Sequence, residues 1–174
     1  MKKIMYPVIA LLIISTSAFA LLLGNWKVKS GESVVKFSGG KIHGAFEGLK
    51  ADINFDKAHP EQAKISASIE VDNIATGFFL KNSHAKDALG AEKYPTIRFV
   101  SSSVKKAGNG YEAEGSLTMK GVTKPVTIRF TFDDKGNEGV FKGGFKVNPK
   151  EYGIDRSGTP DQVNIELVVP VSKS

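Results

Sequence analysis

The residues best suited to acid–base chemistry or metal binding in this chain are its three histidines, His43, His59 and His84. The sequence has no cysteine, so a zinc site would have to use imidazoles and carboxylates. No two histidines have the i, i+4 or H-x-H spacing that places both rings on one metal ion. We expect His43 at the surface and His59, which precedes Pro60, in a solvated turn. His84 is then the imidazole best placed to meet a polar head group.

The sequence patterns typical of enzymes are also absent. The chain has no G-x-S-x-G nucleophile elbow, and its glycines are scattered rather than grouped as in a phosphate-binding loop. The neighbouring carboxylates of Asp133 and Asp134 fall in an apparent hairpin turn, where aspartate is favoured for backbone reasons. We therefore predict that the protein is not an enzyme and that it uses neither a metal nor a cofactor.

Most of the chain after Val34 alternates apolar with polar residues, which is the pattern of strands that bury one face. Clear examples are the stretches 49–56, 64–71, 111–119 and 126–133. Glycine, proline, asparagine and aspartate separate these stretches, as short turns require. About eight antiparallel strands with almost no helix to cover them must fold back on themselves, so we predict an all-β sandwich or barrel.

The predicted inward face mixes large aromatic residues with small ones. Ala51, Ala67, Ala113, Gly115 and Gly143 would leave space along the axis of a barrel, and about eight strands are just enough to enclose one small ligand. The sequence therefore predicts an apolar cavity. The alternative is a solid core in which small residues face large ones, as dense packing requires. The inward aromatic residues predicted to contact a ligand are Phe37, Phe55, Phe99, Phe130 and Phe145.

The segment from Thr76 to Pro95 interrupts the strand pattern. Residues 82–92 have helical spacing and stop before the Tyr94-Pro95 pair, so we predict a short helical connection there that caps one mouth of the barrel. Three adjacent apolar residues before it are predicted to line an entrance, with polar residues near the polar end of the ligand. The alternative is that the three apolar residues plug the barrel end as ordinary core. These candidate ligand-binding residues are Phe78, Phe79, Leu80, Lys81, Asn82 and His84.

The N-terminal segment is organised like a secretory signal peptide. Lys2 and Lys3 precede an uncharged apolar stretch that reaches an A-x-A site at residues 18–20. We predict that residues 1–20 are cleaved and that residues 21–174 form one domain. Export to the periplasm is expected, because the chain lacks the cysteines of a disulfide scaffold. A retained membrane anchor is the alternative, since residues 21–23 prolong the apolar run.

The mature domain is mildly basic. Without Lys2 and Lys3 it has 22 Lys and Arg residues against 18 Asp and Glu, a net charge of +4. This excess favours contact with an anionic membrane surface, although many exported proteins are mildly basic without a charged partner. Export argues against nucleic acid as a partner.

One stretch carries a family resemblance. GSLTMKGVTKPVTIRFTF, residues 115–132, resembles the G-x-L-T-x-x-G-V-T-K/R-P-V run of the YceI-like family of bacterial periplasmic lipid-binding proteins. DNIATG at 72–77, EKYPTIRFVS at 92–101 and the terminal YGID and VNIELVV also fit, in the expected order. The resemblance implies a lipocalin-like antiparallel barrel whose apolar pocket holds a polyisoprenoid, an isoprenoid quinone, a fatty acid or a fatty amide. It supplies no catalytic residue.

The chain departs from that family in the helical connection. Many members carry R-D-x-H-L before an aromatic pair that precedes E-K-Y-P, whereas this chain has FLKNS at 79–83 and Ala88-Leu89 at those positions. The loss of the Arg-Asp pair predicts a more apolar or differently specific site.

Three hypotheses follow for the function. The first is reversible binding, transport or storage of a long-chain isoprenoid or acyl lipid, by one chain or by a homodimer that encloses the lipid jointly. The second is a solid-cored stress or interaction protein that acts at the membrane surface. The third is a lipid-modifying enzyme that uses His84 with a nearby acid.

Overall fold

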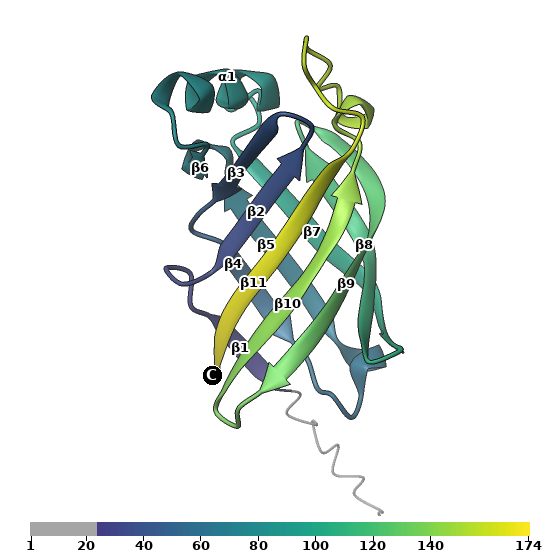
Figure 1. The fold of residues 1–174 in the computed structure, drawn as a ribbon. Coiled ribbons are helices and arrows are strands. Elements are labelled where there is room, and N and C mark those ends of the chain that lie inside the picture. The colour runs from purple at the N-terminus through teal and green to yellow at the C-terminus, as the bar shows by residue number, and fades with distance from the viewer. Residues whose placement is uncertain (1–23) are drawn as a thin grey trace, which may run out of the picture.

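The computed structural model describes residues 24–174, and the predicted signal peptide lies outside the described residues. The described part has one α-helix, α1 (Phe79–Leu89), and three short 3-10 helices, η1 (Pro60–Gln62), η2 (Val71–Asn73) and η3 (Pro149–Tyr152). Its strands, shown in Figure 1, are β1 (Asn25–Val28), β2 (Val34–Gly39), β3 (Ile42–Phe46), β4 (Lys50–Asn54), β5 (Lys64–Glu70), β6 (Ile74–Ala75), β7 (Thr96–Ala107), β8 (Gly110–Met119), β9 (Val122–Asp134), β10 (Glu138–Val147) and β11 (Val163–Lys173).

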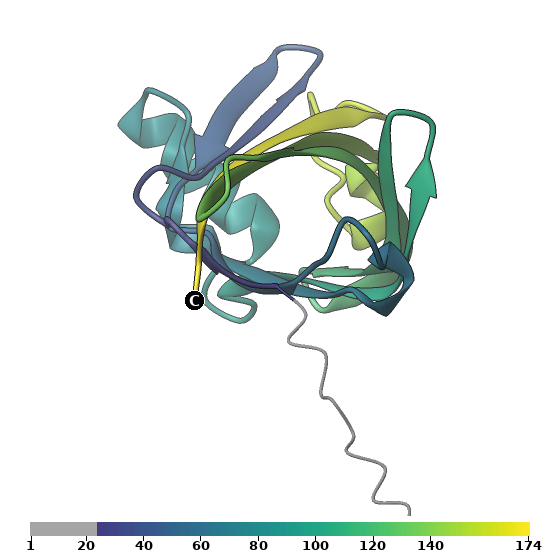
Figure 2. The same ribbon diagram turned by 90° about the horizontal axis from the view of Figure 1, so that it is seen from below.

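These strands close into one antiparallel barrel of eight strands, because three of the eight are each interrupted once. β1 continues into β2, β3 into β4, and β5 into β6. β1 pairs with β4 and β2 with β3, while β4 pairs with β5 and β3 with β6. From β5 the order is β7, β8, β9, β10 and β11, and β11 closes the ring against both β1 and β2. Figure 2 shows the ring along its axis. The predicted all-β, eight-stranded barrel with a short helical connection is confirmed.

One end of the barrel is closed by an aromatic layer, which consists of Trp26, Phe55, Tyr111, Phe130, Phe132 and Phe141. The Phe55 ring is 1% exposed and lies 4.9 Å from the Tyr111 ring and 5.4 Å from the Phe132 ring, measured between centroids. These contacts are edge-to-face, the arrangement that aromatic quadrupoles favour. The indole Nε1 of Trp26 donates a 3.0 Å hydrogen bond to the Phe55 carbonyl, which joins β1 to the chain after β4.

The opposite end of the barrel, which we call the α1 end, carries α1, η3 and the β2–β3 turn (Figure 1). Residues 82–92 were predicted as helical, but α1 begins and ends three residues earlier. Gly90 ends it because this residue has φ of 69°, a left-handed conformation that favours glycine. Leu89 is buried, and Ala85 and Ala88 pack against the core. The C-terminal half of α1 therefore lies on the barrel.

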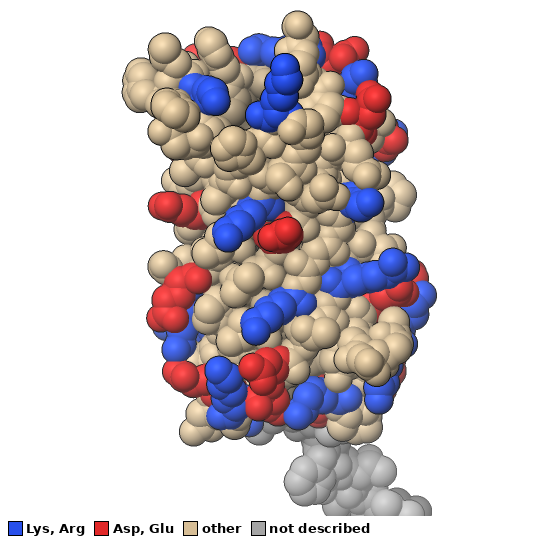
Figure 3. Space-filling view, in the orientation of Figure 1, with Lys and Arg blue, Asp and Glu red and all other residues tan. Residues whose placement is uncertain are grey.

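The outward face of the barrel is charged and solvated, with acidic and basic side chains interspersed (Figure 3). The side chain of Arg129 on β9 donates a 2.8 Å hydrogen bond to Glu112 on β8, which lowers the pKa of that carboxyl. Lys105 on β7 bonds Glu114 and lowers its pKa in the same way. Exposed pairs of this kind contribute little to stability. The fold is therefore held chiefly by its apolar interior.

Candidate functional site

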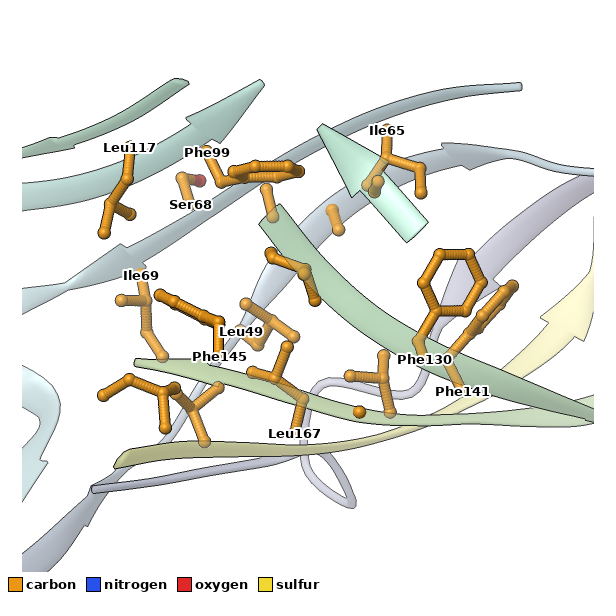
Figure 4. Close-up of a pocket in the computed structure, with 18 of the residues that line it drawn as sticks. Leu49, Ile65, Ser68, Ile69, Phe99, Leu117, Phe130, Phe141, Phe145 and Leu167 are labelled. Carbon is orange, nitrogen blue, oxygen red and sulfur yellow. The ribbon is translucent and has the colours of Figure 1, made fainter. Parts of the chain in front are cut away.

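The barrel interior contains an apolar cavity of about 150 Å³ that is partly open to solvent. In the close-up of Figure 4, Phe130 and Phe141 of the aromatic layer lie at one side of it, and Leu117 and Ile69 lie at the other. A cavity of this size lined by aliphatic and aromatic side chains can hold a molecule the size of benzene. The residues that line it are Val35, Leu49, Ala51, Ile53, Ile65, Ala67, Ser68, Ile69, Ile97, Arg98, Phe99, Ala113, Leu117, Ile128, Phe130, Phe141, Gly143, Phe145, Ile165, Leu167 and Val169.

Strand register explains how residues far apart in sequence meet at this cavity. Ala51 on β4 pairs with Ala67 on β5, and Ala67 pairs in turn with Phe99 on β7. Phe99 then pairs with Leu117 on β8, so these four residues form one row across neighbouring strands. Since alternate side chains of a strand point to the same face, all four line the interior. The two adjacent alanines leave open space beside the Phe99 ring.

Gly115 on β8 shows that small residues here also serve packing. A Cβ atom at Gly115 would lie 2.7 Å from Cε2 and 2.8 Å from Cζ of Phe99, so the ring occupies the space that a side chain would need. Of the small residues predicted to leave room for a ligand, Ala51, Ala67, Ala113 and Gly143 line the cavity. The cavity predicted from the sequence therefore accounts for the small residues that line it, whereas dense packing accounts for Gly115.

The five inward phenylalanines of the sequence analysis divide into two groups. Phe99, Phe130 and Phe145 line the cavity. Phe55 lies in the aromatic layer, and the Phe37 ring packs on Phe46, with 5.5 Å between centroids. Neither of these two lines the cavity described here. Their contact with a ligand stays a prediction.

The three adjacent apolar residues at the start of α1 do not line the cavity in this structure. Phe78 is 64% exposed, Phe79 85% and Leu80 69%. The ammonium of Lys81 lies 4.9 Å from the centre of the Phe78 ring, a cation–π distance. The portal role assigned to these residues stays a prediction.

The polar candidates on α1 also lie outside the cavity lining. The Asn82 Oδ1 accepts 2.7 Å hydrogen bonds from both the backbone N–H and the hydroxyl of Thr76. Asn82 therefore joins the preceding loop to the helix. The side chain of His84 is exposed. Contact of either residue with a ligand head group stays a prediction.

Aliphatic side chains make up most of the cavity wall, although the ligand contacts predicted on the inward face of the barrel are all phenylalanines. Leu49, Ile65, Ile69, Leu117 and Leu167 are typical of this group. The period-2 pattern that selected the phenylalanines marks these residues equally well. Ser68 and Arg98 also border the cavity, but they are register partners that alternate with Ala67 and Phe99, and Arg98 is exposed. No His, Asp or Glu of residues 24–174 lines the cavity, so its described wall offers no acid–base pair.

The hydroxyl of Tyr152 lies in apolar surroundings at the α1 end. Tyr152, the last residue of η3, is 2% exposed, and its hydroxyl oxygen has no hydrogen-bond partner among the described residues. Burial is the main cause that raises the pKa of this phenol, and the negative charge of Glu151 raises it further. The group therefore stays neutral at ordinary pH. A buried polar group without a partner is destabilising.

We predict that Tyr152→Phe raises the free energy of unfolding by about 1 kcal/mol, because the substitution removes an unsatisfied hydroxyl and keeps the ring. Urea denaturation measures the change. Glu151→Gln, at an exposed neighbouring position, is the control and should leave the midpoint unchanged. A less stable Tyr152→Phe protein would show that the hydroxyl gains a hydrogen bond in the folded state.

Two kinds of site are not found in residues 24–174. No group of three or more His, Asp or Glu side chains there is arranged to hold a metal ion. Of the helices in that range, none combines the length and the apolar character required to cross a bilayer.

Comparison with known proteins agrees with this fold. A family model described as the YceI-like domain matches residues 26–171. A UPF0312 protein of Serratia proteamaculans is 32% identical over 138 residues, which cover 75% of this chain and 72% of the relative. The crystal structure of BcnA of Burkholderia cenocepacia is similar with a TM-score of 0.77 and 26% identity, over 82% of this chain and 98% of that one. A polyisoprenoid-binding domain from Saccharophagus degradans, implicated in plant cell wall breakdown, has the same fold with a TM-score of 0.64 and 11% identity, over 87% and 99% of the two chains.

Proposed function

The chain belongs to the YceI-like family, and from this premise we propose that it binds a long-chain isoprenoid or acyl lipid in the barrel cavity and carries or stores it without chemical change. The apolar cavity inside the barrel is the observation that carries the proposal. The Saccharophagus degradans domain, described as polyisoprenoid-binding, supports the ligand class. We further propose that the protein acts in the periplasm after removal of residues 1–20.

The cavity wall suits the hydrocarbon part of such a ligand. Burial of each methylene contributes about 0.8 kcal/mol, so affinity should rise steeply with chain length. The described lining contains no His, Asp or Glu, and without an acid–base pair the wall favours binding over turnover.

The size of the cavity sets a condition on this proposal. Typical ligand pockets measure about 300–1,000 Å³, whereas this cavity measures about 150 Å³. It holds a short stretch of hydrocarbon as it stands, and a longer chain must displace lining side chains. Phe145 and Leu167 line the cavity and are only partly buried, so they are the residues we expect to change rotamer, as side chains at binding sites commonly do.

Native mass spectrometry tests the proposal. The protein is purified from the periplasm of its own bacterium without detergent, and bound molecules are extracted into organic solvent and identified. We expect an isoprenoid or acyl compound at one molecule per chain, and an intact mass that lacks residues 1–20. A ligand-free mass that persists after incubation with isoprenoid quinones and fatty acids would instead support the solid-cored interaction protein.

A further inference from the structure

Phe78, Phe79 and Leu80 are three consecutive exposed apolar residues at the α1 end, which we call the apolar tip. Each is more exposed than any other large apolar residue of the described chain. Isolated exposed apolar side chains are common on protein surfaces, but adjacent ones mark sites of interaction with a partner or a membrane.

The local structure holds the apolar tip away from the barrel interior. The chain turns at Gly77, whose φ of 82° is in the left-handed region. The two hydrogen bonds from Thr76 to Asn82 Oδ1 then fix the loop against the first turn of α1. The other part of the helix packs on the core through Leu89. Inward rotation of the tip would break these contacts, so its outward position is built into the fold.

The charges beside the apolar tip are basic. Residues 73–86 contain Lys81, His84 and Lys86, and the carboxylates of Asp72 and Asp87 flank this range. Lys86 is paired with Asp72 at 3.0 Å, whereas Lys81 lies over the Phe78 ring. In Figure 3 the surface over α1 is largely uncharged, with blue side chains beside it. An exposed apolar group bordered by lysine has the composition of elements that lie in the interface of an anionic bilayer.

We propose that the apolar tip inserts into the surface of an anionic phospholipid bilayer and so docks the α1 end of the barrel on the membrane. This inference rests on the proposed function, because it specifies where lipid enters and leaves. A stable protein–protein interface needs about 800 Å² from each partner, more than three side chains at the end of one short helix provide. A bilayer has no such minimum, since each inserted side chain contributes separately.

Vesicle co-sedimentation tests the proposal with vesicles of phosphatidylglycerol and phosphatidylethanolamine. The serine variant combines Phe78→Ser, Phe79→Ser and Leu80→Ser. It should bind vesicles at least about tenfold more weakly than the unchanged protein. The control combines Val100→Ser and Val168→Ser, which remove exposed apolar side chains from the barrel wall, and it should bind as the unchanged protein does. Lys81→Gln should weaken binding mainly at low salt.

A fluorescent variant gives a second readout that does not depend on loss of binding. Phe79→Trp keeps the apolar tip apolar, while the one natural tryptophan, Trp26, is 5% exposed inside the barrel. The emission of the tryptophan introduced in place of Phe79 should shift to shorter wavelength when the vesicles are added. No shift, or equal sedimentation of the serine variant and the unchanged protein, would overturn the proposal. If the unchanged protein forms dimers that the serine variant does not form, and neither binds vesicles, the tip would be assigned to contact with a second copy of the chain.

The outcomes separate this inference from the proposed function. Lipid uptake from solution by the unchanged protein, measured without vesicles, tests the carrier function independently of the apolar tip. If the unchanged protein binds vesicles through the tip but takes up no lipid, the docking surface stands and the lipid-carrier function fails. If the unchanged protein takes up lipid but the serine variant sediments with vesicles normally, the lipid-carrier function stands and the docking surface fails.

Discussion

Ala67→Phe should weaken binding of a long-chain isoprenoid about a hundredfold or more while making the protein more stable. Ala67 lies between Ala51 and Phe99 in the row that lines the cavity, whose volume is about 150 Å³. A phenyl ring fills a cavity of that size. Exclusion of about four methylenes from the wall would cost about 3 kcal/mol of binding free energy. Cavity filling commonly adds about 0.5–2 kcal/mol to the free energy of unfolding.

The opposite signs of the two effects make the result specific. Fluorescent-lipid titration measures binding, and urea denaturation measures stability on the same sample. Ser66→Phe is the matched control, because Ser66 precedes Ala67 on β5 and points to the other face. It should leave lipid binding unchanged. If Ala67→Phe binds lipid normally while remaining folded, the ligand does not occupy this cavity.

Phe55→Ala should lower the free energy of unfolding by about 3–5 kcal/mol, because it leaves a large cavity in dense packing. The Phe55 ring contacts four aromatic rings, those of Tyr111, Phe130, Phe132 and Phe141, with centroids 4.9–5.7 Å away. Domains of ordinary stability unfold at about 5–15 kcal/mol, so this one substitution would remove a large share of the total. Urea denaturation, monitored by tryptophan fluorescence, measures this loss of stability.

Phe37→Ala is the comparison for Phe55→Ala. Phe37 is also an inward phenylalanine, but it is only partly buried and packs chiefly on Phe46. Its truncation should cost clearly less, since fewer contacts and a smaller cavity are involved. Equal losses at the two positions would show that the aromatic layer has no special share in stability.

The barrel could be predicted from the sequence because alternation of apolar and polar residues is a local property. Residues 126–133 show it clearly, and they lie in β9. β3 has no such signal, since Gly44 and Ala45 stand where large residues would mark a face. Gly44 is small because the Phe37 ring occupies the space of its missing side chain. This pairing depends on the register of β2 and β3, which the sequence does not reveal.

The candidate site could be predicted only in part, because alternation identifies the face of a residue but not its height in the barrel. Phe55 and Phe99 are both inward, yet Phe55 lies in the aromatic layer and Phe99 beside the cavity. Height depends on strand tilt and register, which form only when the barrel closes. The portal prediction for Phe78 to Leu80 rested on their apolarity and on their place in a connection expected to cap the barrel mouth, and neither reveals how exposed the side chains are.

The difference between the two barrel ends has a consequence for exchange kinetics. The aromatic layer closes one end, so a chain that passes through an end of the barrel enters and leaves at the α1 end. Entry and release then share one path and one transition state. A change at the α1 end that slows entry should slow release by the same factor, and the affinity should stay the same. If the ligand is the proposed lipid, its hydrocarbon tail leads on entry and follows on exit, because the cavity wall is apolar, and its polar head then remains at the α1 end.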